Sequence, residues 1–558
     1  MRLSNREAIA KVTKLNNFWV IDPLKTSDEP GINVLIDLIL EEMKQSGIPI
    51  PSQHVYKKKL QENIKVILCN LIHAYHLDIE RYIGFSRDSG FYKDKNSKLS
   101  YENVKKVTDF LKDHNYIEFV LGHPKYKEYR QGHLSRMKAT PKLIELIDAY
   151  KITEDMVKRD ISNTETIIVK GLKPKPRFTK IKVEGGYKLE KTQEKRKIVA
   201  TPNTKAVREM RRKLHVINQV LANAKISLDM TKEELTELNA KLTSDWDPYK
   251  TAIDPTKATL HRVFLDGKLD KGGRFYGGWW QNIPKEARKR ILIDGFQVDE
   301  PDFSAYHPRI LYALKRLKYP DNDPYELEGY STDTRTFLKR LLLIMLNTTG
   351  KTQEAARRKA IKRIEYDVSI GKIEQPEEVK DIDALIDKFI EKHQPVQEYF
   401  FTGFGTTLMY IDSQIAEAIL FQHAQEGIPV LPVHDSFIID YRLSESMQDC
   451  MVSIYDNMFS QPIPTSSNIS DLEMYEAERF RSFTKSFTDG PETVEFFEKT
   501  MAQQIEYMLE DMRSREYGAI PVPDYEDMAA EAYCEERREN TPDDFEDDFE
   551  DYFDEFEP

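Results

Sequence analysis

The sequence is poor in cysteine and has no long apolar run. Its three cysteines, Cys69, Cys450 and Cys534, lie far apart among 558 residues and form no Cys-x-x-Cys pair. This spacing supports neither a disulfide framework nor a cysteine zinc site. No window approaches the ~18 apolar residues of a membrane helix. The first twenty residues lack the apolar core of a signal peptide, and we therefore expect a cytoplasmic protein.

Charge is distributed unevenly along the chain. Residues 521–558 hold 17 Asp and Glu against two Arg, a net charge of −15, so the other residues sum to +3 (−12 + 15). Residues 170–213 hold 16 Lys and Arg against four Glu, a net charge of +12. Two interpretations stay open. The chain is a nucleic-acid binder whose acidic tail mimics phosphate, or these are two unrelated solvated segments.

Length and periodicity divide the chain into several segments. The length indicates two to four domains, and the acidic, aromatic-rich end is typical of disorder. We expect six segments: 1–150 (helical or winged-helix-like, nucleic-acid-binding), 151–205 (basic linker), 206–270 (helical), 271–485 (the most informative region), 486–520 (C-terminal helix) and 521–558 (disordered acidic tail).

The pattern from 100 to 147 resembles a winged helix-turn-helix domain. A helix led by Ser100 ends near His114, and the strand "YIEFVLG", a basic hairpin-like stretch and a second helix follow. Lys105 and Lys106 on the first helix are then candidate phosphate contacts. The wing would add Lys125, Lys127, Arg130 and Arg136. The alternative is an ordinary helical domain with a basic hairpin.

The run "GIPVLPVHDSFIIDY" (427–441) predicts two short strands around a polar turn. A carboxylate at Asp435, between two buried strands, is unfavourable unless a cation, an Arg or a helix N-terminus meets it. The alternative is a turn aspartate that bonds its own backbone.

A second carboxylate, Asp302, follows the strand-like "FQVDEP" and precedes the helical "AYHPRILYAL". If the strands at Asp302 and Asp435 are neighbours in one sheet, the two carboxylates converge. Converging carboxylates repel unless a divalent cation lies between them, and Mg²⁺ prefers one or two carboxylates plus phosphate oxygens. Two such ions are the usual clamp of phosphoryl transfer.

The segment "RTFLKRLLLIMLN" (335–347) predicts a helix with a cationic stripe. Arg335, Lys339, Leu343 and Asn347 recur every four residues, and the other faces are apolar. A rigid helix that aims Arg and Lys at one place suits a triphosphate. The alternative is a solvated basic face.

These three segments together resemble a known superfamily. "DFSAYHPR" (302–309) resembles motif A of the family A DNA polymerases, and "RTFLKR" (335–340) resembles motif B, which the bacteriophage-type single-subunit RNA polymerases share. "VHDSF" (433–437) resembles motif C of those RNA polymerases. The motifs occur in the family order, and the resemblance covers about residues 270–445.

The resemblance implies roles for particular residues. Asp302 and Asp435 match the metal-binding aspartates, and the backbone carbonyl of Phe303 would join them. Arg335, Lys339 and Arg340 match the cations that hold the incoming triphosphate, with Lys339 also catalytic. The cofactor would be two Mg²⁺ ions, with Mn²⁺ as a substitute.

Other matched positions are expected near the nucleic acid and the sugar. His434 and Ser436 flank motif C near the primer terminus, and Arg274 and Tyr276 in "GGRFYGG" match a template-contacting element. His307 stands at the steric-gate position of the DNA enzymes. Asn347 and Thr348 replace the Tyr-Gly that ends motif B, which puts sugar preference in doubt. Asp412 and Glu417, in the helical stretch before motif C, either face the site or form a solvated acidic face.

The resemblance implies an α+β, right-hand-like polymerase with an antiparallel-sheet palm, compact helical fingers and a thumb in 206–270. We expect a template-directed nucleotidyltransferase that takes a DNA template, nucleoside triphosphates and a growing strand. RNA synthesis is favoured, with DNA synthesis close behind. The setting would be phage or mobile-element replication in the cytoplasm of a bacterial or phage-infected cell. The alternatives are a non-enzymatic winged-helix replication initiator or transcription regulator, and an untemplated nucleotide-adding enzyme.

Overall fold

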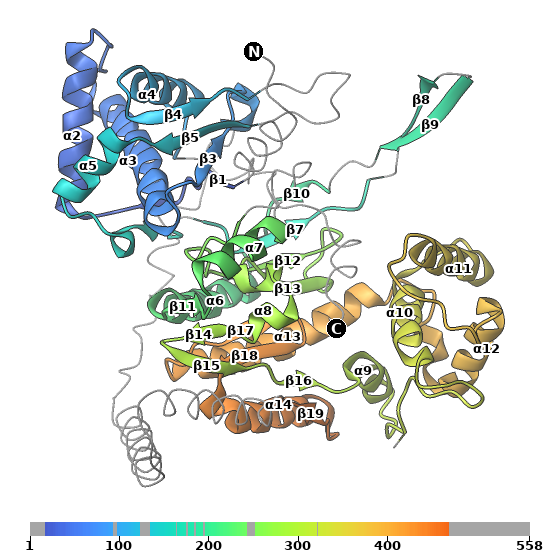
Figure 1. Cartoon of the computed structure of the whole chain (residues 1–558). Helices are drawn as coiled ribbons and strands as arrows, with labels where there is room; N and C mark the ends of the chain where they lie inside the picture. Colours follow the sequence, from blue (N-terminus) through green and yellow to red (C-terminus); the bar gives the residue numbers. More distant parts are fainter. Residues whose placement is uncertain are drawn as a thin grey trace, which may run out of the picture. The chain divides into compact units, whose positions relative to one another are not determined.

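The computed structural model describes residues 17–92, 98–122, 134–162, 164–174, 177–183, 186–192, 196–242, 252–320 and 322–467. They form an α+β structure, as expected, and divide into two compact units (Figure 1). Unit 1 contains the described residues up to Glu165 together with those of Asp229–Lys257. Unit 2 contains those of Thr166–Leu228 and those from Ala258 onward. The division therefore passes through the predicted thumb-like region 206–270.

Several sequence predictions lie outside the described residues. These are the C-terminal helix, the acidic tail and the wing cations Lys125, Lys127 and Arg130. Within the part of the chain that the structure describes, every helix is too short or too polar to span a lipid bilayer.

Unit 1 is built on a four-stranded sheet with the order β1-β3-β5-β4. β1 runs parallel to β3, and the other neighbours are antiparallel. Its strands are β1 (Phe18–Val20), β3 (Tyr82–Phe85), β4 (Ile117–Val120) and β5 (Ser135–Ala139), and β2 (Lys25–Thr26) pairs separately with β6 (Lys158–Arg159). Its helices are α2 (Pro30–Gln45), α3 (His54–Leu77), α4 (Tyr101–Asp113), α5 (Pro141–Ala149) and α7 (Lys232–Leu242), with 3₁₀ turns at η1 (Ser89–Tyr92) and η2 (Glu154–Met156).

The helices of unit 1 form where apolar residues recur at helical spacing. The helix predicted from Ser100 to near His114 is confirmed by α4, and the apolar residues of 54–77 form α3 in the same way. Ser100 is the N-cap of α4, although its side chain makes no capping hydrogen bond. β5 lies between β3 and β4, and α4 connects β3 to β4. This order is compatible with a winged helix, which stays a prediction.

Unit 2 contains a seven-stranded sheet with the order β11-β14-β15-β18-β16-β19, in which β17 also pairs with β18. All of its described pairings are antiparallel. The strands are β11 (Ile226–Leu228), β14 (Ile291–Ile293), β15 (Phe296–Asp299), β16 (Asp302–Phe303), β17 (Leu431–Val433), β18 (Ser436–Asp440) and β19 (Thr465–Ser466). The hairpin predicted within 427–441 is therefore confirmed by β17 and β18.

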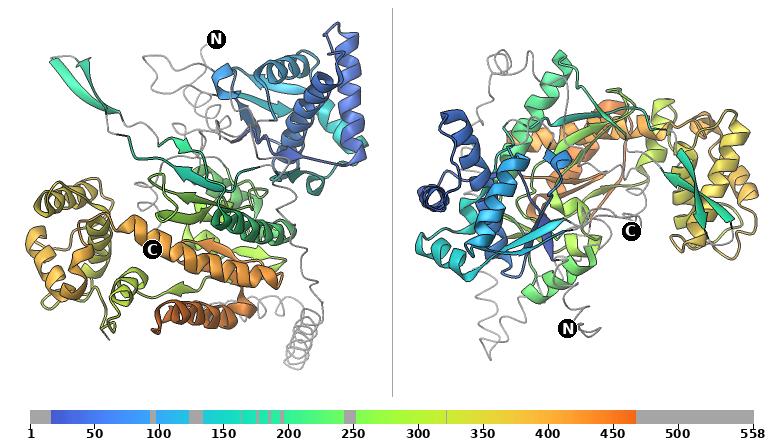
Figure 2. Two further views of the ribbon diagram at one scale, coloured as in Figure 1. Left: turned by 180° about the vertical axis from the view of Figure 1, so that it is seen from behind. Right: turned by 90° about the horizontal axis from the view of Figure 1, so that it is seen from above.

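A second sheet of unit 2 has the order β10-β7-β12-β13, with β7 parallel to β12. Its strands are β7 (Ile167–Lys170), β10 (Ile198–Val199), β12 (His261–Phe264) and β13 (Gly272–Tyr276). Between β7 and β10, the hairpin of β8 (Arg177–Val183) and β9 (Gly186–Thr192) extends away from this sheet (Figure 2). The expected basic linker 151–205 thus contains strands of both units.

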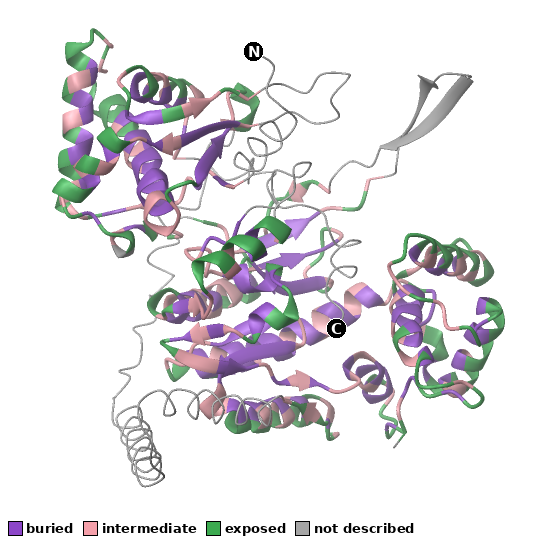
Figure 3. Ribbon diagram, viewed as in Figure 1, coloured by how far each residue is buried: buried purple, intermediate pink, exposed green. Residues whose placement is uncertain are grey.

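Helix α13 (Gly405–Gln425) is the central helix of unit 2. It is buried along most of its length (Figure 3), because it packs on β13, on α6 (Lys205–Asn223) and on α14 (Ser444–Phe459). A helix covered on several sides is apolar around most of its circumference. The remaining helices are α8 (Lys285–Arg288), α9 (Tyr306–Leu314), α10 (Thr334–Asn347), α11 (Gln353–Ser369) and α12 (Ile382–Lys392), with 3₁₀ turns η3 (Trp279–Asn282), η4 (Gln394–Tyr399) and η5 (Tyr441–Leu443).

Candidate functional site

The structure brings Asp302 and Asp435 together. Asp302 lies on β16, where its Cα is the register partner of Ser436 at the start of β18. Asp435 is the residue before Ser436, in the two-residue turn that joins β17 to β18. Two carboxylates that are 133 positions apart along the chain (435 − 302) therefore share one end of the sheet. This is the arrangement that the two motifs predicted.

The charge of Asp302 is poorly compensated by its neighbours. Its Oδ1 atom is buried and takes no hydrogen bond from the described residues. Burial, the carboxylate of Asp435 and that of Glu300 raise the pKa of Asp302 well above its ordinary value. The backbone N–H of Phe303 and, more weakly, Lys285 at the start of α8 oppose this rise in the pKa. A half-buried carboxylate whose buried oxygen has no hydrogen-bond partner, beside a second carboxylate, fits a hard divalent cation, which takes oxygen ligands.

The donor set of such a cation would be small. It comprises the carboxylates of Asp302 and Asp435 and the backbone carbonyl of Phe303, whose ring packs inside the unit against Tyr306 at a centroid distance of 4.6 Å. Among the described residues, no three His, Cys, Asp or Glu side chains gather into a preformed metal-binding group. The residues present therefore fit Mg²⁺ or Mn²⁺ completed by substrate phosphates and water, rather than an all-protein site.

The turn that carries Asp435 is shaped by its neighbour His434. His434 adopts a φ of 59°, in the left-handed region that Asn, Asp and His tolerate better than most residues. Burial, with Arg274 nearby, lowers the pKa of His434 to about 3, so the ring is neutral at pH 7. The carboxylate of Asp435 takes no hydrogen bond from the described backbone of its own turn. The alternative of a self-bonded turn aspartate is therefore not supported.

Arg274, Asp412 and His307 form a buried cluster beside the carboxylate pair. Arg274 on β13 donates from Nε to both carboxylate oxygens of Asp412 on α13, at 3.2 and 2.9 Å, and also from Nη2. His307 Nε2 lies 3.4 Å from Arg274 Nη2 and 3.6 Å from Asp412 Oδ2. Although burial favours its neutral form, the carboxylates of Asp412 and Asp435 raise the pKa of Arg274. Arg274 is thus a fixed cation near the pair.

A second arginine anchors the same helix. Arg262 on β12 contacts Glu417 of α13, and donates to Ser413 Oγ at 3.0 Å and to the Gly273 carbonyl at 2.7 Å. Gly273 has a φ of 85°, and a Cβ there would lie 2.9 Å from Ser413 Oγ, so the close approach of β13 to α13 needs glycine. Asp412 and Glu417 are both buried. The alternative of a solvated acidic face is therefore wrong, because β12 and β13 cover it with arginines.

The cations of α10 divide into two groups. Arg335 pairs with Asp323 at 2.8 Å, and both Arg335 and Lys339 lie near the ring of Tyr325. Arg340 is buried instead and bonds Asp367 of α11, from Nε at 2.9 Å and from Nη2 at 2.6 Å. Arg335 and Lys339 are half-exposed. The ion pair of Arg340 with Asp367 holds α10 against α11. The buried position of Arg340 therefore does not support the predicted contact with a triphosphate.

Other predicted contacts are occupied within the protein. Asn347 donates to the Leu343 carbonyl at 2.8 Å and packs against Gly405. Tyr276 is buried near His434, with a ring distance of 6.2 Å. Ser436 donates its hydroxyl to Glu300 at 2.7 Å. These places give no support for direct contacts to nucleic acid by Tyr276 and Ser436.

In unit 1, the residues predicted to contact phosphate differ in their exposure to solvent. Lys105 is exposed on α4, whereas Lys106 is half-buried and reaches the Pro49 carbonyl at 3.5 Å. Arg136 is buried on β5 with its guanidinium 4.2 Å from the ring of Phe18. Arg136 therefore belongs to the core of unit 1, and the predicted wing contact does not fit its burial.

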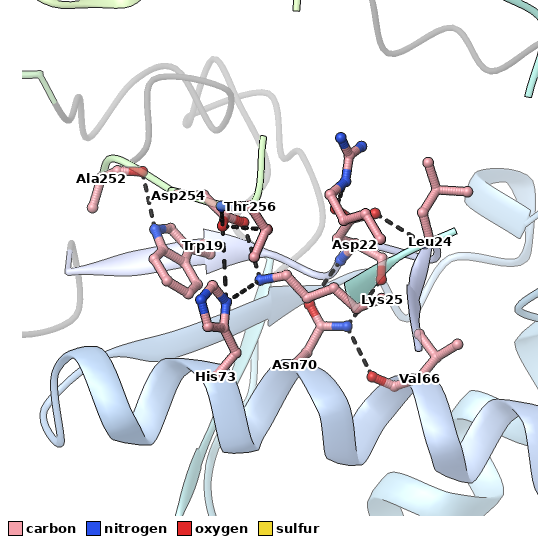
Figure 4. A network of polar contacts seen from close by, with 11 residues as sticks. Trp19, Asp22, Leu24, Lys25, Val66, Asn70, His73, Ala252, Asp254 and Thr256 are labelled. Atoms are coloured by element: carbon pink, nitrogen blue, oxygen red, sulfur yellow. Dashed lines mark hydrogen bonds and ion pairs between the residues drawn. The ribbon is translucent and has the colours of Figure 1, made fainter. Parts of the chain in front are cut away.

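Unit 1 contains a buried polar network that the sequence did not predict (Figure 4). Lys25 Nζ lies 3.0 Å from Asp254 Oδ2 and 2.8 Å from His73 Nδ1, and its side chain is completely buried. Trp19 donates from its indole nitrogen to the Ala252 carbonyl at 2.9 Å. The segment that carries Ala252 and Asp254 is thereby fixed to α3 and β1. No local sequence pattern predicts the role of Asp254, because its partner Lys25 is more than 200 positions away in the chain.

Local sequence patterns did not predict the roles of Glu300 and Arg288 either. They form a bidentate ion pair beside Asp302, and only the folded sheet brings "KEAR" next to "DEPD".

No protein-family model matches this chain, and no curated protein matches it significantly.

Proposed function

We propose that the chain is a template-directed nucleic acid polymerase whose reaction centre is the Asp302–Asp435 pair. The observation that supports the proposal most is the convergence of these carboxylates, with a buried oxygen of Asp302 unpartnered. When bound, two Mg²⁺ ions would stabilise the attacking 3′ oxygen and the departing pyrophosphate. The motif order A, B, C adds the sequence resemblance to this geometry.

In this proposal, unit 2 supplies the parts of a right-hand-like polymerase. The seven-stranded sheet is the palm, the group α10–α12 forms compact fingers, and α6 belongs to the thumb. Arg335 and Lys339 bind the triphosphate, because they are half-exposed and lie on one face of a rigid helix. Arg340 positions α10 through Asp367, and Arg274 holds α13 and His307 in place.

The substrates are a DNA template, nucleoside triphosphates and a growing strand. RNA synthesis remains the favoured product on the motif B and motif C resemblance, with DNA synthesis second. By the motif resemblance, His307 and Asn347 would contact the sugar of the incoming nucleotide. The hairpin β8–β9 (177–192) and α6 each carry five Lys and Arg, which suits contacts with phosphates.

A second candidate function is a non-enzymatic replication initiator or regulator. The observation that favours it is the strand order of unit 1, with the exposed Lys105 on the helix α4 that precedes β4. This function requires DNA binding without divalent cations and without nucleotide incorporation.

The test is primer extension by the purified full chain on a primed DNA template, with Mg²⁺ and either ribo- or deoxyribonucleoside triphosphates. We expect extension by the wild type. We expect a loss of about a thousandfold in Asp435→Asn, since metal catalysis supplies several kcal/mol and each 1.36 kcal/mol is tenfold in rate. DNA binding should persist in this variant.

The matched control is Asp456→Asn, which removes an exposed carboxylate from α14 and should leave extension unchanged. Equal extension by Asp435→Asn and the wild type would contradict the proposal. DNA binding by a wild type that incorporates neither nucleotide set would support the initiator or regulator instead. Extension of the 3′ end regardless of template sequence would indicate an untemplated enzyme.

A further inference from the structure

Glu300 lies between β15 and β16, two residues before Asp302, and contacts two other elements. Its carboxylate accepts two hydrogen bonds from Arg288 at the end of α8, from Nε to Oε2 at 3.0 Å and from Nη2 to Oε1 at 2.9 Å. Oε1 also accepts the hydroxyl of Ser436 at 2.7 Å. The side chains of Arg288 and Glu300 are only 8% and 11% exposed, so this is a built contact rather than a surface pair.

These bonds connect the two halves of the carboxylate site. Ser436 directly follows Asp435, and Glu300 lies in the short link that leads into β16 and Asp302. The backbone adds one further bond there, from the Phe437 N–H to the Pro301 carbonyl at 3.0 Å. The Ser436–Glu300 side-chain bond and the Phe437–Pro301 backbone bond thus join the hairpin of Asp435 to the residues just before Asp302.

Arg288 is itself held in place. Its Nη1 donates to the carbonyl of Ile283 at 3.2 Å, at the end of the turn that precedes α8. A bidentate arginine–carboxylate pair fixes the carboxylate in both direction and rotation. Glu300 therefore presents Oε1 to Ser436 from a fixed position, and all three side chains are oriented before any ligand arrives.

We infer that Glu300, Arg288 and Ser436 form a positioning clamp that sets the separation of Asp302 and Asp435 for a divalent cation. Two carboxylates in a low-dielectric site repel each other, so the turn tends to move away from β16. The Ser436–Glu300 bond opposes this movement. The inference rests on the metal site of the proposed function. It also gives Ser436 a role that needs no contact with nucleic acid.

The clamp resembles, in its chemistry, the outer-shell partners that orient metal ligands. Removal of such partners costs about 10–100-fold in metal affinity or activity. Both oxygens of Glu300 already accept hydrogen bonds, Oε1 from Arg288 and Ser436 and Oε2 from Arg288. Its effect is therefore exerted through the positions of Asp302 and Asp435.

The experiment measures Mn²⁺ binding to the full chain by electron paramagnetic resonance of the free ion, without nucleotide or nucleic acid. The variants are Ser436→Ala, Glu300→Ala, which removes the acceptor oxygen that a glutamine would keep, and the double variant. We expect each single variant to weaken Mn²⁺ binding by about tenfold or more. The double variant should be little weaker than the worse single variant, since both act through one bond.

The matched control is Thr465→Val on β19, the other neighbour of β16. It removes a hydroxyl that bonds Gln448 at 3.0 Å and has no contact with Glu300. Its Mn²⁺ affinity should equal that of the wild type. Thermal unfolding of every variant in EDTA gives the temperature range in which it is fully folded. The clamp predicts weaker Mn²⁺ binding within that range, whereas a general loss of stability does not.

Unchanged Mn²⁺ affinity in Ser436→Ala would overturn the clamp, whether or not the protein extends primers. Fully additive losses in the double variant would also overturn it. The absence of Mn²⁺ binding to the wild type would overturn the clamp and the metal site together. Weaker binding in both single variants with no primer extension by the wild type would support the clamp and contradict the polymerase.

Discussion

The buried carboxylates of unit 1 and the Asp302–Asp435 pair of unit 2 are compensated in opposite ways. In unit 1, the completely buried Lys25 meets Asp254 at 3.0 Å, and Asp22 meets Arg159 at 2.6 Å, so each charge has an opposite partner. In unit 2, Asp302 and Asp435 meet at the end of a sheet, and a buried oxygen of Asp302 has no hydrogen-bond partner among the described residues.

This difference separates structural charges from a candidate reaction centre. Burial alone would raise the pKa of Asp254, but Lys25 and His73 hold it below its ordinary value. For Asp302, burial and the neighbouring carboxylates act in the same direction and raise the pKa. A compensated carboxylate stabilises the fold, whereas an uncompensated one stores repulsion that a cation can relieve.

The largest expected effect on stability is in unit 1. Asp254→Asn leaves Lys25 buried without its carboxylate, and breaking a buried pair in this way costs about 3–5 kcal/mol. Hydrogen exchange of the α3 amides measures the loss, because α3 lies in the core of unit 1. Asp148→Asn, at an exposed site on α5, is the control and should change the free energy of unfolding by less than about 0.5 kcal/mol. If Asp254→Asn and Asp148→Asn both change the free energy of unfolding by the same small amount, the Lys25–Asp254 pair does not stabilise unit 1, and the contrast with Asp302 fails.

The next effect is a dependence on pH. Burial, with Lys25 nearby, lowers the pKa of His73 from 6.5 to about 3. Below pH 6.5 the unfolded chain therefore binds a proton that the folded chain excludes, and stability falls as the pH falls towards 3. The slope is about 1.4 kcal/mol per pH unit, or about 2 kcal/mol between pH 6.5 and 5.

His73→Gln provides the control for this pH effect, since it removes the titrating ring from α3. Hydrogen exchange of the α3 amides in both proteins at pH 6.5 and pH 5 gives the difference. The wild type should lose the larger amount of unfolding free energy on acidification. If the two proteins lose the same amount, the neutral, buried His73 is not the cause.

A smaller effect of opposite sign is expected in unit 2. Asp302→Asn removes one of two repelling charges, so the metal-free protein should become more stable by about 1 kcal/mol. This corresponds to a rise of about 2–4 °C in Tm, measured in EDTA. The same variant should lose Mn²⁺ binding. A lower Tm in EDTA would mean that the carboxylate of Asp302 is compensated after all.

The smallest effect on stability concerns Arg335. Its pair with Asp323 is about 40% exposed on both sides, at 43% and 36%, and surface pairs contribute little. Arg335→Ala should therefore change the free energy of unfolding by less than about 0.5 kcal/mol. The KM for the nucleoside triphosphate should rise about tenfold, since a hydrogen bond to a charged group contributes about 1.5–3 kcal/mol. An unchanged KM would remove Arg335 from the proposed triphosphate site.

Local sequence patterns predicted the elements that carry the two carboxylates. The apolar runs on both sides of His434 and Asp435 became β17 and β18, and the strand-to-helix change near Asp302 became β16 and α9. These patterns succeed because alternation and helical spacing are properties of neighbouring residues. The convergence of Asp302 and Asp435 followed from the assumption that the two strands are neighbours.

The sequence did not predict which charges compensate one another. Arg274 was expected to touch nucleic acid, yet it is covered by Asp412, and Arg340 is covered by Asp367. Such pairings depend on which helix packs on which strand, and that is decided by contacts between residues distant along the chain. Glu300 was overlooked for the same reason, because Arg288 and Ser436 come to it from two different elements.

The return of residues 229–257 to unit 1 has a consequence for how this architecture can be inherited. Within the described residues, the backbone passes from one unit to the other at 165–166, 228–229 and 257–258. A single genetic crossover can exchange a contiguous module, but it cannot transfer unit 1 complete with Asp254. Recombination at the first boundary would take Lys25 from one parent and its partner Asp254 from the other. The two units are therefore expected to have been inherited together.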